Sequence, residues 1–242
     1  MNRNEFFDIN KFPKDWGIII LGISMSRTSN TQSPTACMEA LDHLVNKVAI
    51  SRVGANFIYS EGLYMNFENN AFETKNHFAQ AAVSHMGAVR NLVQKNRERF
   101  QIDHAFSFES WFQMYLSHPD FFSILKKVKD FYATDPKFQQ WVVKDSEEQG
   151  KELNERQLAF YLEEHTWEYL LLNRQLKLRN EFVNDREQWV LFAYPGKPSK
   201  AQIYLYQQDP LKLNDDSNPY KGQYDLDSKK FIDYTRVELE SF

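Results

Sequence analysis

The sequence predicts an α/β fold in which helices flank a mostly parallel sheet. The first observation is the apolar run of residues 18–23, which contains only one glycine and ends directly before Ser24. So continuous an apolar run is typical of a strand that is covered on both faces. The second observation is the order of the next segments, an amphipathic helix at 35–46 and a strand-like segment at 47–53. A strand–helix–strand order predicts a right-handed parallel crossover.

Periodicity and capping signals predict the remaining elements. A long helix is expected at 72–100 and a short strand at 104–108. Further helices are expected at 107–118, 120–134, 136–148 and 154–172, with Asp135 as the cap of the third. The segments 188–194 and 201–206 predict two more strands. The polar, acidic segment 209–242 is expected to be a tail that lies along the surface or is partly disordered.

Length and composition limit the class of protein. The 242 residues suit a single domain spanning 1–242, because no linker or repeat divides them. The single cysteine, Cys37, excludes an internal disulfide and favours a reducing compartment. No signal sequence or membrane span is evident, so we expect a soluble cytoplasmic protein. The net charge of −4 argues against indiscriminate nucleic-acid binding but allows a local basic face.

Ser24 is the first candidate functional residue. Ligands of open α/β sheets bind beyond the carboxyl ends of the strands, where Ser24 is expected to lie, and Gly22 would allow close approach of a substrate. The alternative is a strand that simply ends in a turn. The sequence has no P-loop, no dinucleotide-binding glycine motif and no Gly-x-Ser-x-Gly elbow. The six histidines show no ligand spacing, so we expect no metal and no cofactor.

Four separated segments together resemble the tRNA-dependent cyclodipeptide synthases. They are Leu21-Gly22-Ile23-Ser24, the stretch from Ser110-Trp111 to Phe138, the segment Phe160 to Glu164, and Ala193-Tyr194-Pro195. Their order and the chain length carry the resemblance, which extends from the first strand to Tyr206. The Tyr-Pro pair is similar to one of the two subfamilies of that family, and Arg27, three residues after Ser24, agrees with it.

The resemblance implies a Rossmann-like domain similar to the catalytic domain of class I aminoacyl-tRNA synthetases. It implies an aminoacyltransferase that makes a cyclic dipeptide from two aminoacyl-tRNAs by a ping-pong mechanism through an aminoacyl-enzyme on Ser24. Glu164 would hold and deprotonate the substrate amine, and Tyr194 would bond to Ser24 or relay protons. Backbone N–H groups near Gly22 and Met25 would stabilise the oxyanion. The family leans towards monomers.

One departure from the family pattern leaves a fourth catalytic candidate open. The family has a tyrosine four residues before the glutamate, but Phe160 occupies that position and Tyr161 follows it. A helix turns about 100° per residue, so these two side chains cannot point the same way. Either Glu164 acts with a different hydroxyl, or the register is shifted by one residue.

The resemblance also implies substrate-binding and tRNA-binding residues. The expected substrate-binding residues are Gly22, Ile20, Arg27, Ile50 and Arg52, and the expected tRNA-binding residues are Arg90, Lys95, Arg97 and Arg99. Each set has a simpler alternative. The basic stretch could be a solvated helix end, where cations are favoured, and Arg27 could be a loop cation.

Other interpretations of the candidate site remain. Tyr194 could simply end a strand, and the paired acids Glu163 and Glu164 could form a solvated helix face. A Rossmann-like serine hydrolase or esterase would fit the strand-end serine, although no histidine is an evident partner for Ser24. A non-catalytic protein that binds charged tRNA is the other alternative. A methyltransferase or nucleotide-binding domain fits less well, because the glycine-rich loop is missing.

Overall fold

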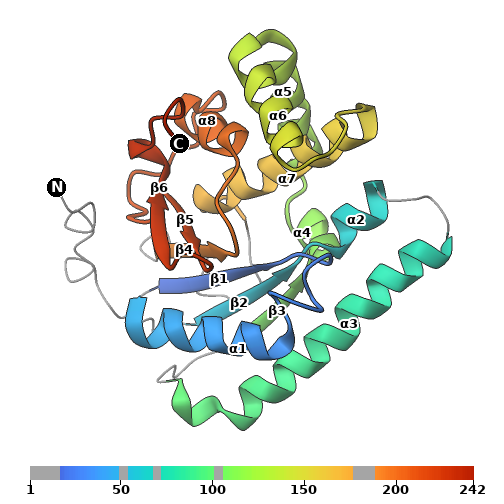
Figure 1. Ribbon diagram of the computed structural model, residues 1–242, viewed down its shortest axis with the longest axis vertical. Helices are drawn as coiled ribbons and strands as arrows, with labels where there is room; N and C mark the ends of the chain where they lie inside the picture. Colours follow the sequence, from blue (N-terminus) through green and yellow to red (C-terminus); the bar gives the residue numbers. More distant parts are fainter. Residues whose placement is uncertain (1–16, 49–53, 68–71, 101–105, 177–188) are drawn as a thin grey trace.

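A six-stranded sheet forms the centre of the molecule. The computed structural model describes residues 17–48, 54–67, 72–100, 106–176 and 189–242. The strand order is β3-β2-β1-β4-β5-β6, with every neighbouring pair parallel except β5 and β6 (Figure 1). The strands are β1 (Gly17–Ile23), β2 (Gly54–Tyr59), β3 (Phe106–Ser110), β4 (Trp189–Tyr194), β5 (Gly222–Asp225) and β6 (Lys230–Asp233). The predicted α/β fold with a mostly parallel sheet is confirmed, and it is Rossmann-like.

Helices cover both faces of this sheet. They are α1 (Pro34–His43), α2 (Glu61–Phe67), α3 (Phe72–Lys95), α4 (Trp111–Ser117), α5 (Phe121–Thr134), α6 (Pro136–Glu148), α7 (Glu155–Leu172) and α8 (Lys200–Gln208). Helices α1 and α3 lie on one side, and α5 to α8 gather on the other (Figure 1). Asp135 caps α6 as predicted, because its Oδ1 accepts a hydrogen bond of 2.7 Å from the Phe138 amide. None of the helices in the described ranges combines the length and the apolar character that a bilayer span requires.

Strand β1 separates two hydrophobic cores. Its alternate residues Ile18 and Ile20 pack into the core that includes α5 to α8, while Ile19, Leu21 and Ile23 face α1 and α3. Successive side chains of a strand point to opposite faces, so the apolar run supplies both cores at once. This is the reason why the run has no polar position.

Two predicted strands are wrong. The second strand is β2 at 54–59 rather than 47–53, because the pairing of Ile18 with Gly54 and of Ile23 with Tyr59 aligns that segment with the whole of β1. Residues 49–53 lie outside the described ranges. The segment 201–206 lies in helix α8, whose Ser199 cap accepts a bond of 3.1 Å from the Gln202 amide. Residues 201–206 are all buried, so this helix lacks the polar face that reveals helical periodicity.

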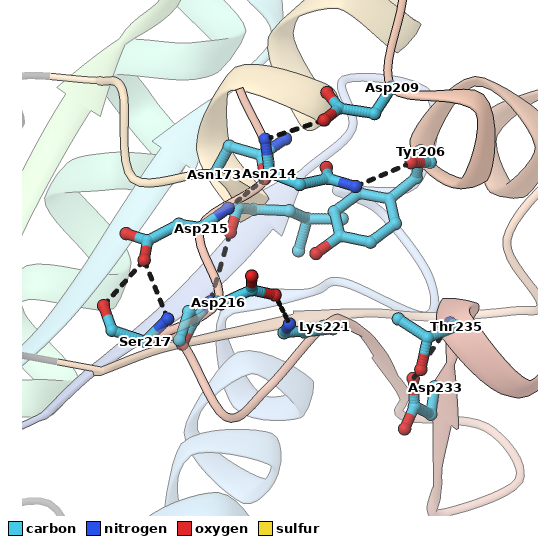
Figure 2. A network of polar contacts seen from close by, with 12 residues as sticks. Asn173, Tyr206, Asp209, Asn214, Asp215, Asp216, Ser217, Lys221, Asp233 and Thr235 are labelled. Carbon is cyan, nitrogen blue, oxygen red and sulfur yellow. Dashed lines mark hydrogen bonds and ion pairs between the residues drawn. The ribbon is translucent and has the colours of Figure 1, made fainter. Parts of the chain in front are cut away.

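The segment 209–242, expected to be a surface or partly disordered tail, contains the two strands β5 and β6. Strand β5 pairs parallel with β4, and β6 pairs antiparallel with β5. The connection before β5 is held by the polar network in Figure 2, in which the Asp215 amide donates to Asn173 Oδ1 and Asn214 Nδ2 donates to the Tyr206 carbonyl, both at 3.2 Å. A 3₁₀ turn at Tyr234–Arg236 follows β6. The segment therefore completes the sheet.

The close approach of β5 and β6 gives the first prediction. A Cβ atom on Gly222 would lie 1.9 Å from the Ile232 carbonyl oxygen, which is backbone and cannot rotate away. We expect Gly222→Ala to lower the free energy of unfolding by about 1–3 kcal/mol, as overpacking does elsewhere. The matched control is Gly87→Ala in α3, where a Cβ meets nothing within 4 Å and alanine stabilises a helix by about 0.5–1 kcal/mol. Urea unfolding measures the free energy of unfolding of both variants. Equal values for Gly222→Ala and Gly87→Ala would contradict the prediction.

Candidate active site

Ser24 lies immediately after β1 at the carboxyl edge of the sheet and is 5% exposed. Its Oγ lies 2.8 Å from the Tyr64 hydroxyl, on α2, and 3.0 Å from Ser26 Oγ. Tyr64 also donates to Ser26 Oγ at 3.1 Å. The side-chain partners of Ser24 are therefore hydroxyl groups, which can pass a proton but are weaker bases than a histidine.

A cavity opens beside Ser24 and is enclosed by the ends of β1, β2 and β4 together with α4 and α7. The space inside it that the centre of a water-sized sphere can occupy is about 80 Å³. The apolar and aromatic lining includes Ile58, Trp111, Met114, Trp167, Leu171 and Phe192. The polar lining is Ser24, Ser60, Glu164, Glu168 and Tyr194. A few polar groups in an apolar cavity are typical of a binding site that orients its ligand.

Two carboxyl groups of α7 face this cavity, one helical turn apart. Burial raises the pKa of Glu164 to about 7, against the opposing charges of Lys151 and Arg27. Burial also raises the pKa of Glu168 to about 8, with a contribution from the charge of Glu164. The Tyr234 hydroxyl donates to Glu168 Oε1 at 2.5 Å. Because each pKa lies close to neutrality, these groups can both hold and accept a proton near pH 7.

Tyr194 ends β4 on the same cavity. Its pKa is raised by burial and by the charge of Glu164, while Ser24 and Arg27 act in the opposite direction. The Arg27 guanidinium carbon lies 5.4 Å from the centre of the Tyr194 ring, within the range of a cation–π contact. Tyr194 is therefore a neutral phenol that can donate or accept a hydrogen bond.

The structure brings four of the predicted residues, Ser24, Gly22, Glu164 and Tyr194, onto one cavity. Arg27 lies beside them through its contact with Tyr194. The reason for a glycine at position 22 differs from the expected approach of a substrate: a Cβ there would lie 3.1 Å from the rings of both Phe192 and Tyr194.

Other predicted residues lie elsewhere. Tyr161 does not line the cavity, since its hydroxyl donates to Gln149 Oε1 at 3.0 Å, and Phe160 packs edge-on against the Tyr64 ring. Ile20 is fully buried in the core rather than on the cavity wall. The predicted substrate-binding residues Ile50 and Arg52 lie outside the described residues.

The predicted tRNA-binding residues lie at the far end of α3. Arg90 and Lys95 belong to the second half of this helix, and Arg97 and Arg99 to the 3₁₀ turn after it, and all are exposed. Helix α3 runs from the carboxyl end of β2 towards the amino end of β3, so this group lies at the sheet edge opposite Ser24. Arg99 is paired with Asp42 at 3.5 Å.

Within the described part of the chain, no group of histidine, cysteine, aspartate and glutamate side chains is arranged to hold a metal ion.

Comparison with known proteins identifies the fold. No family model matches the chain, and no curated protein matches it. A cyclodipeptide synthase from Candidatus Glomeribacter gigasporarum, solved bound to Phe-tRNAPhe, has a TM-score of 0.54 at 16% identity over 90% of this chain and 89% of that one. A CDPS from Fluoribacter dumoffii has a TM-score of 0.51 at 15% identity over 82% of this chain and 84% of that one. The chain has the fold of these cyclodipeptide synthases.

Several residues of the cavity were not predicted from the sequence. Glu168 follows Glu164 at the helical spacing of four, a signal that places both on one face of α7. Trp111, on the cavity, and Tyr64, which bonds to Ser24 but does not line the cavity, had no such signal, because they come from segments far from Ser24 in the sequence. Ile58 takes the wall position that was expected of the segment 47–53.

The buried carboxyl groups predict how stability depends on pH. The ordinary pKa of glutamate is 4.5, and the folded values of Glu164 and Glu168 are about 7 and about 8. At a pH between the ordinary pKa and the raised folded values, the folded state binds more protons than the unfolded state. The free energy of unfolding therefore falls as pH rises through this range. We expect Glu168→Gln to make the fall between about pH 5 and pH 8 shallower, because its amide does not titrate.

Urea unfolding at a series of pH values measures this slope. The control is Glu147→Gln on the exposed surface of α6, whose slope should match that of the unmodified protein. An identical slope for Glu168→Gln and the control would show that Glu168 does not hold its proton in the folded state.

Proposed function

We propose that this chain is an aminoacyltransferase that joins amino acids from two aminoacyl-tRNAs into a cyclic dipeptide. The observation that carries the proposal is the placement of Ser24 on a cavity that also presents Glu164 and Tyr194. The fold shared with cyclodipeptide synthases supports it, and one of those was solved with a charged tRNA. The Tyr-Pro pair at 194–195 further supports assignment to the Tyr-Pro subfamily.

The first step is a transesterification. Ser24 Oγ attacks the ester carbonyl of the first aminoacyl-tRNA, and the bond to the ribose oxygen of the tRNA breaks. The Ser24 proton passes to that oxygen, and the Tyr64 hydroxyl, 2.8 Å from Oγ, and the Tyr194 phenol are the groups placed to relay it. One ester replaces another, so no nucleotide is consumed.

Two aminolysis steps complete the ring. The amine of the aminoacyl group on Ser24 attacks the ester of the second aminoacyl-tRNA, which releases that tRNA and leaves a dipeptide on Ser24. The free amine of the dipeptide then attacks the Ser24 ester, closes the ring and regenerates the hydroxyl. Both amines must lose a proton, and Glu164, with a pKa near 7, binds the ammonium group as an anion and accepts its proton.

Glu168 adds a second carboxyl group to this step. It lies one turn along α7 from Glu164, and its pKa is raised in part by the charge of Glu164. Two carboxyl groups in one cavity do not both ionise easily, because their negative charges repel each other. A bound ammonium group offsets this repulsion with its positive charge and so favours the form in which both carboxyl groups are ionised. The pair therefore couples amine binding to loss of a proton.

Dependence on Ser24 is the direct test of the proposed reaction. We expect bacteria that express the chain to release cyclic dipeptides into the medium, and we expect Ser24→Ala to abolish them, because no acyl-enzyme can form. Mass spectrometry of the medium measures the products and identifies their amino acids. The purified protein with charged tRNAs provides the same comparison without dependence on the host.

Product that persists in Ser24→Ala would contradict the acyl-enzyme. A folded protein that makes no product from charged tRNAs would contradict the synthase function. Hydrolysis of small model esters that depends on Ser24 but not on tRNA would instead favour the serine hydrolase.

The exposed arginines at the end of α3 and in the 3₁₀ turn after it predict how tRNA is bound. We expect the double variant Arg90→Glu with Arg97→Glu to raise KM for charged tRNA, with kcat little changed, because phosphate contacts supply affinity and lie far from Ser24. The slope of log Kd against log salt should fall by about 0.7–0.9 for each lost phosphate contact. The matched control is Lys127→Glu with Lys129→Glu on the exposed surface of α5.

Filter binding at several salt concentrations measures this slope. If the α5 pair alters the slope and the α3 pair does not, the tRNA binds along the opposite face of the molecule.

A further inference from the structure

We propose that Gln32 is a positioning residue for the Ser24 nucleophile, held in place by His85 and Tyr59. The inference rests on the proposed function, because it concerns the reactivity of Ser24. Gln32 lies in the loop between β1 and α1 and is 2% exposed, although it has no place in the reaction steps described above.

The side-chain amide of Gln32 bonds to the backbone on both sides of Ile23. Its Oε1 accepts a hydrogen bond of 2.7 Å from the Ser24 amide, and its Nε2 donates to the Gly22 carbonyl. A primary amide has a donor and an acceptor side by side, which matches the alternating groups of a strand edge. Gln32 is therefore bonded to β1 as one residue of a neighbouring strand would be.

The place of these bonds explains why a side chain is needed there. The Ile23 carbonyl accepts from the Ser60 amide at 3.0 Å, so Ile23 faces the β2 side, and Gly22 and Ser24 face the opposite side, towards β4. The pairing of β1 with β4 ends at Leu21 and Ala193. Gln32 therefore continues the ladder beyond the last β1–β4 pair and holds the final residues of β1 extended up to the nucleophile.

Gln32 is itself held from the opposite side by a histidine. Its backbone carbonyl accepts a bond of 2.7 Å from His85 Nε2 and a longer one of 3.4 Å from the Cys37 thiol. A carbonyl can only accept, so Nε2 carries the hydrogen, and burial lowers the pKa of His85, which favours the neutral ring. His85 Nδ1 is then the acceptor for the Tyr59 hydroxyl, 3.0 Å away.

This chain of contacts assigns separate roles to the groups around the nucleophile. The Ser24 amide is bonded to Gln32, so the backbone of Ser24 is fixed while its Oγ remains directed at Tyr64 and Ser26. Tyr59, His85 and Gln32 connect β2 and α3 with the end of β1, and none of the three lines the cavity. Their effect on the reaction is exerted through the position of Ser24.

Two variants of Gln32 and one control test the proposal. Gln32→Met removes both bonds while keeping a similar length. Gln32→Glu can reproduce both bonds only when its carboxyl group is protonated, because an ionised carboxylate cannot donate to the Gly22 carbonyl. The control is Gln139→Met in α6, which loses a comparable bond of 2.8 Å from Nε2 to the Tyr132 carbonyl, remote from Ser24.

The measurement is kcat and KM for cyclic dipeptide formation from charged tRNA between about pH 6 and pH 8.5, a range that spans the raised pKa values of buried glutamates. We expect Gln32→Met to lower kcat about 100-fold with little change in KM, as misplacement of a reacting group does. The kcat of Gln32→Glu relative to the unmodified protein should rise as pH falls. The titratable groups packed around Gln32 are Cys37, Tyr59 and His85, and burial shifts the pKa of each towards the neutral form, upwards for Cys37 and Tyr59 and downwards for His85.

If Gln32 had only a structural role, its substitution would lower the free energy of unfolding. It would not change the pH dependence of the kcat of Gln32→Glu relative to that of the unmodified protein. If Gln32→Met keeps the kcat of the Gln139→Met control, or if the loss in Gln32→Glu is the same at every pH, the proposal is wrong. If the unmodified protein makes no product, the proposed function fails, and hydrogen exchange decides the inference on its own. Exchange at the Ser24 amide should then be faster in Gln32→Met than in the control, and equal protection overturns it.

Discussion

The arrangement of the site depends on the complete burial of β1. This strand is paired on both edges with parallel strands and is covered on both faces, with Ile18, Ile19 and Ile20 wholly inaccessible. A slip of one residue would exchange the sets that face the two cores, so the register is strongly determined. Ser24 is therefore held at a fixed height above the sheet, although it lies at the start of a loop. The carboxyl ends of β2 and β4 meet at the same edge and supply the other cavity walls.

Helix α7 is largely buried and also carries two carboxyl groups that face the cavity. Most of its residues are buried and pack against the sheet and the neighbouring helices, yet it presents Glu164 and Glu168 to an apolar cavity. Removing carboxyl groups from water is unfavourable unless they are neutral or compensated. Here the compensation is partial, from the Tyr234 hydroxyl on Glu168 and from Lys151 and Arg27 near Glu164. The cavity thereby retains groups whose charge a cationic ligand can change.

The sequence predicted the features that local pattern determines. The run before Ser24 and the Tyr194-Pro195 pair mark strand ends, and parallel strands bring such ends together without any knowledge of side-chain contacts. Helix α8 was mistaken for a strand because burial on all sides removes the periodicity on which the assignment depends. The role of the segment 209–242 was missed because β5 and β6 are short, and their pairing follows from the rest of the sheet.

The unpredicted parts of the site share a different cause. Gln32, Tyr64 and Trp111 reach the surroundings of Ser24 from three separate segments, and no spacing in the sequence relates them to it. Their positions follow only from the complete packing of loop, helix and sheet. Glu168 is the exception, since its spacing from Glu164 places both on one helical face.

The contact between Tyr234 and Glu168 has a consequence for synthesis of the chain. Ser24 and the first strands leave the ribosome early, whereas the hydroxyl that bonds to Glu168 comes from the turn after β6. Domains fold as units while the chain is made, at about 5–20 residues per second. A nascent chain that has not yet reached Tyr234 therefore lacks the hydroxyl that bonds to Glu168 in the folded domain. The cavity acquires its final proton affinity only when the last strand of the sheet has been translated and paired.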